Sequence, residues 1–219
     1  MHLLLTVVSC VLLCTLSAVA QETETPEQNT YWWFPDRVTL SNGEGNTSPS
    51  RPVSFVNDTL YEFDVSGPFS ITAWLRVSST GTNFWRAAVS IESPDATSAL
   101  FRVALPPDQM RFNVAWMRSA QARGGAINTT AVAPGPGVDF HFALVKDKDN
   151  AITIYVDGVK RAFHTLSTQI FNPGSKQIVL GRTKLDGNSA RSQWNGMIRD
   201  VTVSEWALTH EDVLRERDN

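Results

Sequence analysis

The stretch QIVLGRTKLDGNSARSQWNGMIRDVTVSEWALTHEDVL, Gln177–Leu214, is the most informative part of the sequence for the fold. Its apolar residues before Gly181 predict a buried strand, and the apolar residues after Gly196 predict a second strand beyond a polar loop. Thr209 can cap a short helix, because Asp212 follows three residues later and lies near the positive helix end. The stretch therefore predicts two strands, a loop and a C-terminal helix.

Strand patterns also fill the chain upstream of this stretch, and no helical periodicity occurs before Thr209. Alternation of apolar and polar residues places one strand face in a core and the other toward water, so most tryptophans are expected in the core. Asp157-Gly158 predicts a primed hairpin turn, because both residues tolerate positive φ. The predicted strands lie within 69–77, 85–91, 110–116, 140–145 and 151–163.

Four motifs in register carry a family resemblance. FSITAWLRV (Phe69–Val77), FHFALVKD (Phe140–Asp147), ITIYVDGV (Ile152–Val159) and the C-terminal stretch occur in the order found in laminin-G-like domains. From Pro52 to Leu214 the chain resembles laminin-G-like and pentraxin-like (concanavalin A-like) proteins. The resemblance implies an all-β, two-sheet antiparallel jelly-roll sandwich with a short C-terminal helix. Family 16 glycoside hydrolases and concanavalin-A-like lectins share this fold.

The N-terminus predicts export. Residues 1–20 are apolar, lack Lys, Arg, Asp and Glu, and end in Ala18-Val19-Ala20, which is typical of a cleaved signal peptide. Residues 21–30 are polar and predict a flexible tail, and residues 31–219 form the expected domain. Tyr31–Phe34 is expected to open it as a strand, the alternative being an exposed platform for stacking sugars. We expect a secreted, extracellular protein with no membrane span in the mature chain.

Composition excludes several functions. Both cysteines, Cys10 and Cys14, lie in the predicted leader, so the mature chain has neither a disulfide framework nor a cysteine-ligated metal. The net charge of −3 is small and its charges are scattered, which argues against nucleic acid as a partner.

The sequence also argues against catalysis. Retaining glycosidases on this fold carry E-x-D-x-x-E on one strand, because their mechanism needs two carboxyl groups about 5 Å apart. The nearest match, Glu62–Gly67, has glycine at the acid position. We therefore expect no catalytic residues, with an atypical glycoside hydrolase as the remaining enzymatic alternative.

The resemblance implies a candidate calcium site. Calcium binds six to eight oxygen atoms, which loops of a sandwich can supply. Asp200 matches an aspartate that helps to bind a structural calcium in many laminin-G-like domains, and Asp58 matches a second ligand. The alternative is that Asp200 is solvated or paired with a cation. Arg182-Thr183-Lys184 stands where pentraxins carry acidic calcium ligands, so pentraxin-type recognition is not expected.

Two further kinds of surface site are predicted. Arg182, Lys184 and Arg191 lie in a predicted loop and could bind sulfated glycans as a basic patch, together with Arg118 and Arg123; ordinary solvated charge is the alternative. N-glycosylation sequons begin at Asn46, Asn57 and Asn128.

These observations predict a non-enzymatic recognition module with lectin-like binding of glycans or extracellular matrix. A protein–protein interaction or structural role outside the cell is the main alternative. The oligomeric state and the ligand's identity stay open.

Overall fold

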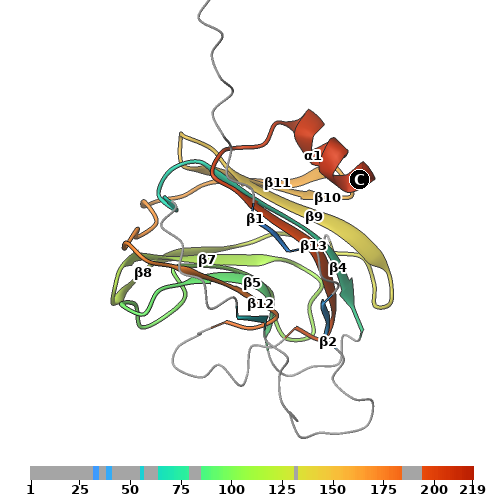
Figure 1. The fold of residues 1–219 in the computed structure, drawn as a ribbon, viewed down its shortest axis with the longest axis horizontal. Coiled ribbons are helices and arrows are strands. Elements are labelled where there is room, and N and C mark those ends of the chain that lie inside the picture. Colours follow the sequence, from blue (N-terminus) through green and yellow to red (C-terminus); the bar gives the residue numbers. More distant parts are fainter. Residues whose placement is uncertain are drawn as a thin grey trace, which may run out of the picture.

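Two antiparallel sheets pack face to face in the computed structural model (Figure 1), which describes residues 64–78, 85–130, 133–183 and 194–219 and the backbone of three short strands before them. In spatial order, sheet A contains β1 (Trp32–Phe34), β13 (Gly196–Ser204), β4 (Phe69–Val77), β9 (Asp139–Lys146), β10 (Ala151–Val156) and β11 (Val159–Thr165), and β2 (Val38–Leu40) also pairs with β13. Sheet B contains β3 (Phe55–Val56), β12 (Gln177–Leu180), β5 (Arg86–Glu92), β6 (Phe101–Leu105), β7 (Asn113–Ser119) and β8 (Ala122–Asn128). The predicted jelly-roll sandwich is confirmed.

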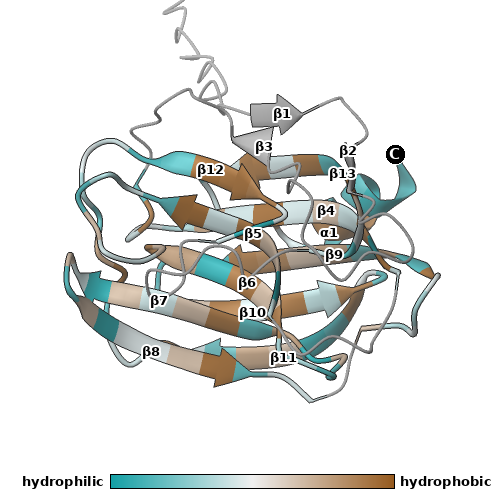
Figure 2. Cartoon of the chain, turned by 90° about the horizontal axis from the view of Figure 1, so that it is seen from below, coloured by the Kyte–Doolittle hydropathy of each residue, from teal (hydrophilic) through white to brown (hydrophobic). Residues whose placement is uncertain are grey.

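The core lies between the two sheets and follows the predicted alternation on their inner faces. On β9, Phe140, Phe142 and Leu144 point inward and are fully buried. Phe112 lies just before β7, and its ring centroid is 4.6 Å from that of Phe142, so the two rings link the sheets. Apolar residues (brown) recur along the strands in Figure 2. The aromatic side chains of both sheets therefore form one continuous core.

The prediction that the second face of each strand meets water is wrong for β5. Arg86 pairs with the core residue Leu105 and lies on the inner face, whereas the polar residues Ser90 and Glu92 lie on the outer face, and all three are buried. These groups satisfy one another in part, because the Ser90 hydroxyl donates to the Glu92 carboxylate at 2.9 Å and lies 3.1 Å from the Arg182 carbonyl. Polar side chains on an outer sheet face can thus be buried when hydrogen bonds replace water.

The glycine that opens β13 is required by the approach of a neighbouring strand. Gly196 has φ of 148°, and a Cβ atom added there would lie 1.8 Å from the Arg76 carbonyl oxygen of β4. The buried Trp194 indole donates to the carbonyls of Arg76 and Met197 at 3.1 and 3.2 Å. The Gly-led strand of the C-terminal stretch is therefore fixed by backbone contact with β4.

The predicted hairpin and helix are both confirmed. Asp157 and Gly158 link β10 to β11 with φ of 52° and 75°, as a primed turn requires. Helix α1 (His210–Asp218) begins after the N-cap Thr209, and the side chains of Thr209 and Asp212 form a reciprocal capping box. The helix covers the outer face of sheet A, where Val213 is buried (Figure 1).

The N-terminal strand is confirmed at the level of the backbone, because β1 pairs with β13. The predicted signal peptide and flexible tail lie outside the described residues. Among the described residues, none of the helices has both the length and the apolar character that crossing a membrane requires.

Candidate functional site

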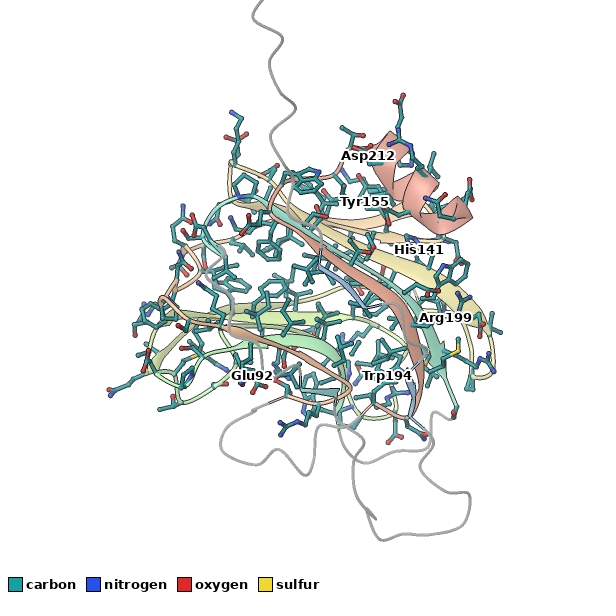
Figure 3. The ribbon with its side chains drawn as sticks, in the orientation of Figure 1. Glu92, His141, Tyr155, Trp194, Arg199 and Asp212 are labelled. Atoms are coloured by element: carbon teal, nitrogen blue, oxygen red, sulfur yellow. The ribbon has the colours of Figure 1, made fainter. Side chains whose placement is uncertain are left out.

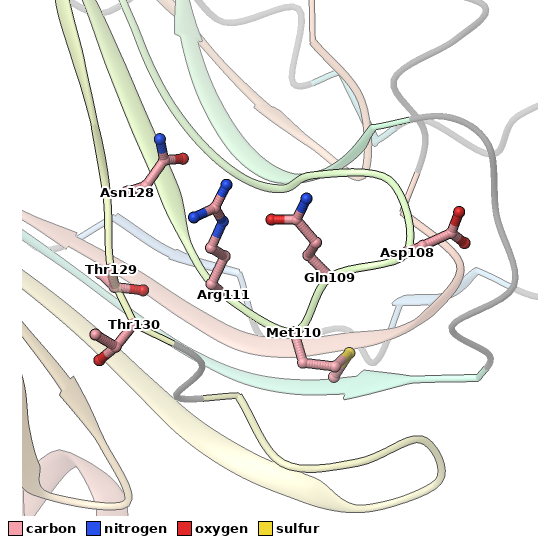
Figure 4. Close-up of a pocket in the computed structure, with 7 residues that line it drawn as sticks. All are labelled: Asp108, Gln109, Met110, Arg111, Asn128, Thr129 and Thr130. Carbon is pink, nitrogen blue, oxygen red and sulfur yellow. The ribbon is translucent and has the colours of Figure 1, made fainter.

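A polar pocket of about 630 Å³ opens at one end of sheet B (Figure 4). One wall is the loop that joins β6 to β7, and the other is the end of β8 with the two residues that follow it. Its lining combines a carboxylate, two amides, a guanidinium, two hydroxyls and one thioether. The lining residues are Asp108, Gln109, Met110, Arg111, Asn128, Thr129 and Thr130.

The first wall is held from beneath by a buried arginine. The Arg86 guanidinium donates to the carbonyls of Pro106, at 3.1 Å, and of Gln109, and contacts the Met110 sulfur at 3.7 Å. Burial lowers the pKa of Arg86, while the negative charge of Asp108 acts in the opposite direction. Because a buried cation anchors two backbone carbonyls, the loop has a fixed shape before any ligand arrives.

The second wall is tied to β7. The Asn113 amide donates to the Asn128 side-chain oxygen at 2.9 Å, and the Thr129 hydroxyl accepts the Phe112 backbone N–H at 2.9 Å. Thr129 is buried, whereas Asn128 and Thr130 are exposed. The hydrogen bond from Asn113 to the Asn128 Oδ1 orients the Asn128 side chain and leaves its Nδ2 available to donate to a ligand.

Arg111 differs from its neighbours because it is not used to build the pocket. Its Nε is buried without a hydrogen-bond partner, and its guanidinium makes no hydrogen bond or ion pair with another described residue. Figure 4 shows it between Asn128 and Gln109, with Asp108 at the far end of the loop. The pocket therefore presents an unneutralised cation flanked by two amides.

Of the predicted basic patch, the structure describes Arg118, Arg123 and Arg182. Arg118 and Arg123 lie beside the β7–β8 hairpin, at the end of these strands away from the pocket, and are not brought together with Arg182.

Arg182 follows β12, and the backbone N–H of the preceding Gly181 donates to the Ala88 carbonyl at 2.9 Å. Ala88 is on β5, and Arg86 at the start of β5 pairs with Leu105, the last residue of β6 before the pocket loop. Arg182 therefore lies at the same end of sheet B as the pocket. Lys184 and Arg191 lie outside the described residues.

The predicted metal ligand Asp200 sits in an irregular part of β13. It has φ of 52° where the register with β4 shifts, and its carboxylate accepts a hydrogen bond from Arg199. Within the described part of the chain, no group of three or more His, Cys, Asp or Glu could hold a metal ion. The described surroundings of Asp200 supply the cation of Arg199 and do not by themselves fit calcium. The second predicted ligand, Asp58, lies outside the described residues.

The segment compared with the glycosidase motif is a bend. The Asp64 carboxylate accepts hydrogen bonds from the Ser66 hydroxyl at 2.6 Å and from its backbone N–H at 2.8 Å, and β4 begins only at Phe69. This local pairing lowers the pKa of Asp64 despite the opposing effect of burial. The described part of the motif therefore does not line up carboxylates on a strand.

The three sequons fall differently in the structure. Asn128 is exposed at the end of β8 and lines the pocket, whereas Asn46 and Asn57 lie outside the described residues. Sequence reasoning identified Asn128 only as a glycosylation site and missed the roles of Gln109, Arg111 and Thr130. The polar residues around Arg111 were the available sequence signal for this site. They could not be told from the solvent-facing residues of an ordinary strand.

Comparisons with known proteins agree with the observed fold. A laminin-G family model, described as the concanavalin A-like lectin/glucanases superfamily, matches residues 46–214. Similar solved structures include a heptameric pentraxin from Limulus polyphemus, with 14% identity, TM-score 0.60, and coverage of 81% of this chain and 79% of that chain. No curated protein sequence matches.

A carbohydrate-binding module of the Ruminococcus gnavus sialidase, bound to α2,3-sialyllactose, is similar with 14% identity and TM-score 0.56, over 85% of this chain and 97% of that chain. A leech intramolecular trans-sialidase has 17% identity and TM-score 0.54, over 72% of this chain but only 26% of the enzyme. At such identities the likeness establishes the fold. With the family model spanning most of the chain, the protein belongs to the concanavalin A-like lectin/glucanases superfamily as a laminin-G-like domain.

Proposed function

We infer that the chain is a secreted, non-enzymatic recognition module that binds a glycan in the pocket between the Asp108–Arg111 loop and the end of β8. The observation that carries this proposal is the pocket's composition. Sugars present many hydroxyl groups, and the amides of Gln109 and Asn128 and the hydroxyl of Thr130 both donate and accept hydrogen bonds. A preformed pocket with a few convergent polar groups is the usual form of a small-ligand site.

The family and its structural neighbours support the same class of ligand. The matched superfamily contains lectins and glucanases, and the Ruminococcus gnavus module was solved with sialyllactose bound. The similarity in fold does not carry over individual contacts, so the site rests on this chain's own residues. Export through residues 1–20 would place the module among extracellular glycans.

The pocket supports binding without hydrolysis. Asp108 is the single carboxylate among its lining residues, whereas glycoside hydrolysis ordinarily uses a pair. Asp108 is exposed and shows no contact that would prepare it as a general acid. We therefore assign the pocket to recognition, with complementary hydrogen bonds supplying the affinity.

The test is a glycan-array screen of the secreted protein, run once with calcium and once with a chelator. We expect selective binding that Gln109→Leu combined with Thr130→Val reduces severalfold, because two hydrogen-bonding groups are lost. Thr165→Val, on the exposed end of β11 in the other sheet, is the matched control and should bind normally.

The outcomes separate the alternatives. Selective binding that the chelator abolishes would favour a calcium-dependent site and direct attention to Asp58 and Asp200. Binding that Arg182→Gln removes while the pocket variant retains it would move the site to the predicted basic patch. No selective binding under either condition would contradict the proposal and favour a protein partner.

A further inference from the structure

We propose that the pocket selects glycans that carry a negatively charged group, a carboxylate or a sulfate, and that Arg111 binds this group. The proposal rests on the glycan-binding function above and specifies the ligand's chemical class. It assigns a role to a residue that the fold does not otherwise use. The site combines the Arg111 guanidinium with the side chains of Gln109, Asn128 and Thr130.

The state of Arg111 is the first argument. Arginine donates five N–H groups in a planar fork that matches a carboxylate or sulfate edge. In this pocket the Nε–H is buried without a partner, and no described carboxylate pairs with the guanidinium. Because the protein covers Nε, a ligand would meet the two terminal nitrogens of Arg111, which make no described hydrogen bond or ion pair and can form a charge-assisted pair with an anion. The pocket is therefore better matched to an anion than to a neutral sugar alone.

The charges around Arg111 are the second argument. The buried Arg86 guanidinium lies directly beneath the pocket loop, where it bonds the carbonyls of Pro106 and Gln109. Asp108 opposes this positive charge, but it is exposed and lies at the far end of the loop in Figure 4. The local charge near Arg111 therefore favours an anion.

The neighbours of Arg111 supply the rest of the recognition. Because Asn113 donates to the Asn128 oxygen, the Asn128 Nδ2 stays available to donate to a second ligand atom. The exposed Thr130 hydroxyl can bond a sugar hydroxyl beside the anion. The same Nδ2 is the atom that N-glycosylation would modify, so a glycan on Asn128 would occupy the mouth of this pocket and compete with the ligand.

The experiment measures affinities by calorimetry with the full chain exported from a bacterial host that adds no N-glycans. The probes are two matched pairs, namely 3′-sialyllactose with lactose, and a sulfated heparin disaccharide with its desulfated form. We expect at least one charged probe to bind more tightly than its neutral counterpart, and the better pair identifies the anion. Arg111→Gln should weaken the charged probe about 10- to 100-fold, as the loss of a charge-assisted hydrogen bond predicts.

Two variants control for charge and folding. Arg161→Gln removes the same charge from the exposed strand β11 of the other sheet and should leave the preference unchanged. Arg111→Lys keeps the charge without the planar fork and should recover part of the affinity. The melting temperature of Arg111→Gln should match the wild type, because Arg111 makes no described hydrogen bond or ion pair.

Each result decides the matter. Equal affinities within both pairs, or a preference for the charged probe that survives Arg111→Gln, would overturn this inference and leave glycan binding intact. Binding to none of the four probes, together with no selective binding on the glycan array, would overturn both proposals. A preference for a charged probe that disappears in Arg111→Gln, is partly kept in Arg111→Lys and survives in the control variant would support the inference.

Discussion

The helix-covered face of sheet A and the pocket end of sheet B both carry charged side chains, but the two regions use them differently. On sheet A, Arg76 pairs with Asp139, and Arg199 lies 3.9 Å from Asp139 and also pairs with Asp200. In the pocket, Arg111 has no such partner among the described residues. The difference indicates that sheet A's charges complete the fold, whereas the charge of Arg111 is left for a ligand.

The sheet A face is closed by α1. Val213 and Leu208 pack on Ala143 and Val145 of β9, and the Tyr155 ring stacks on the His210 ring with centroids 5.5 Å apart. Figure 3 shows Tyr155 and His141 beneath the helix that carries Asp212. Such a face contributes stability through burial of apolar area.

One tryptophan departs from the predicted core position in a way that fits this contrast. Trp74 lies on the outer face of sheet A and is half-buried. The Arg199 guanidinium lies 4.7 Å from its ring centroid, and the His141 ring lies 5.6 Å away. These side chains cover the indole of Trp74, so its ring packs against other residues of the protein.

The largest effect is expected where the helix meets the hairpin turn. Gly158 has φ of 75°, and a Cβ atom there would lie 2.5 Å from a Leu214 methyl group of α1. Gly158→Val should lower the free energy of unfolding by about 4 kcal/mol, from backbone strain and displaced helix packing. Urea unfolding measures it.

Gly174→Val is the control, because a Cβ atom at Gly174 meets nothing within 4 Å. Glycan affinity of the folded Gly158 variant should equal that of the wild type. A loss of affinity without a loss of stability would contradict the division between the two regions.

The next effect is a pH dependence from His141. Burial lowers the pKa of His141 to about 4, with Arg217 adding to the shift and Asp157 and Asp218 opposing it. Since the folded pKa lies below the ordinary value of 6.5, the unfolded chain binds the proton first as pH falls. Stability should therefore be full above pH 6.5 and decline toward pH 4, by roughly 2–3 kcal/mol between pH 7.5 and 4.5.

Denaturant unfolding at these two pH values measures the loss. His141→Gln should flatten the dependence in this window, because the variant lacks the buried imidazole whose pKa differs between the folded and unfolded chain. An unchanged slope in the variant would show that other groups cause the acid destabilisation.

The smallest of these effects on stability is expected beneath the pocket. Arg86→Met would leave the carbonyls of Pro106 and Gln109 without their buried donor, which costs about 1–3 kcal/mol. The pocket loop should also lose its fixed shape, so affinity for the charged probe should fall with stability. Calorimetry and thermal unfolding of this variant, beside the control Arg161→Gln, measure both changes. Unaltered affinity would show that Arg86 is not needed to organise the pocket.

Some elements could be predicted because their signals are local. The Asp157-Gly158 turn and the Thr209 cap depend on the conformational preferences and hydrogen bonds of residues close in sequence, and both appear as expected. The strands of β4 and β9 carry enough alternation to define their inner faces. The order of these motifs then identified the family that the model match confirms.

The pocket could not be predicted in the same way, because it is formed by segments that meet only after folding. Arg111 and Asn128 lie in different strand-end segments, and the buried Arg86 that supports the loop comes from a third. Nothing near Arg111 in sequence shows that its Nε is buried without a partner. The burial of the Arg86 guanidinium likewise depends on carbonyls from another segment of the chain.

Local patterns were enough to predict the strands, the hairpin turn, the capped helix and the family, since periodicity and backbone preference act over a few residues. Which charged side chains acquire a partner depends instead on how the two sheets pack. Asp200 and Arg111 are both ordinary polar residues in the printed chain, yet folding pairs the first with Arg199 and places the second in an open pocket. Electrostatic partnership depends on distances between chain segments, and those distances are set by the packing of the two sheets.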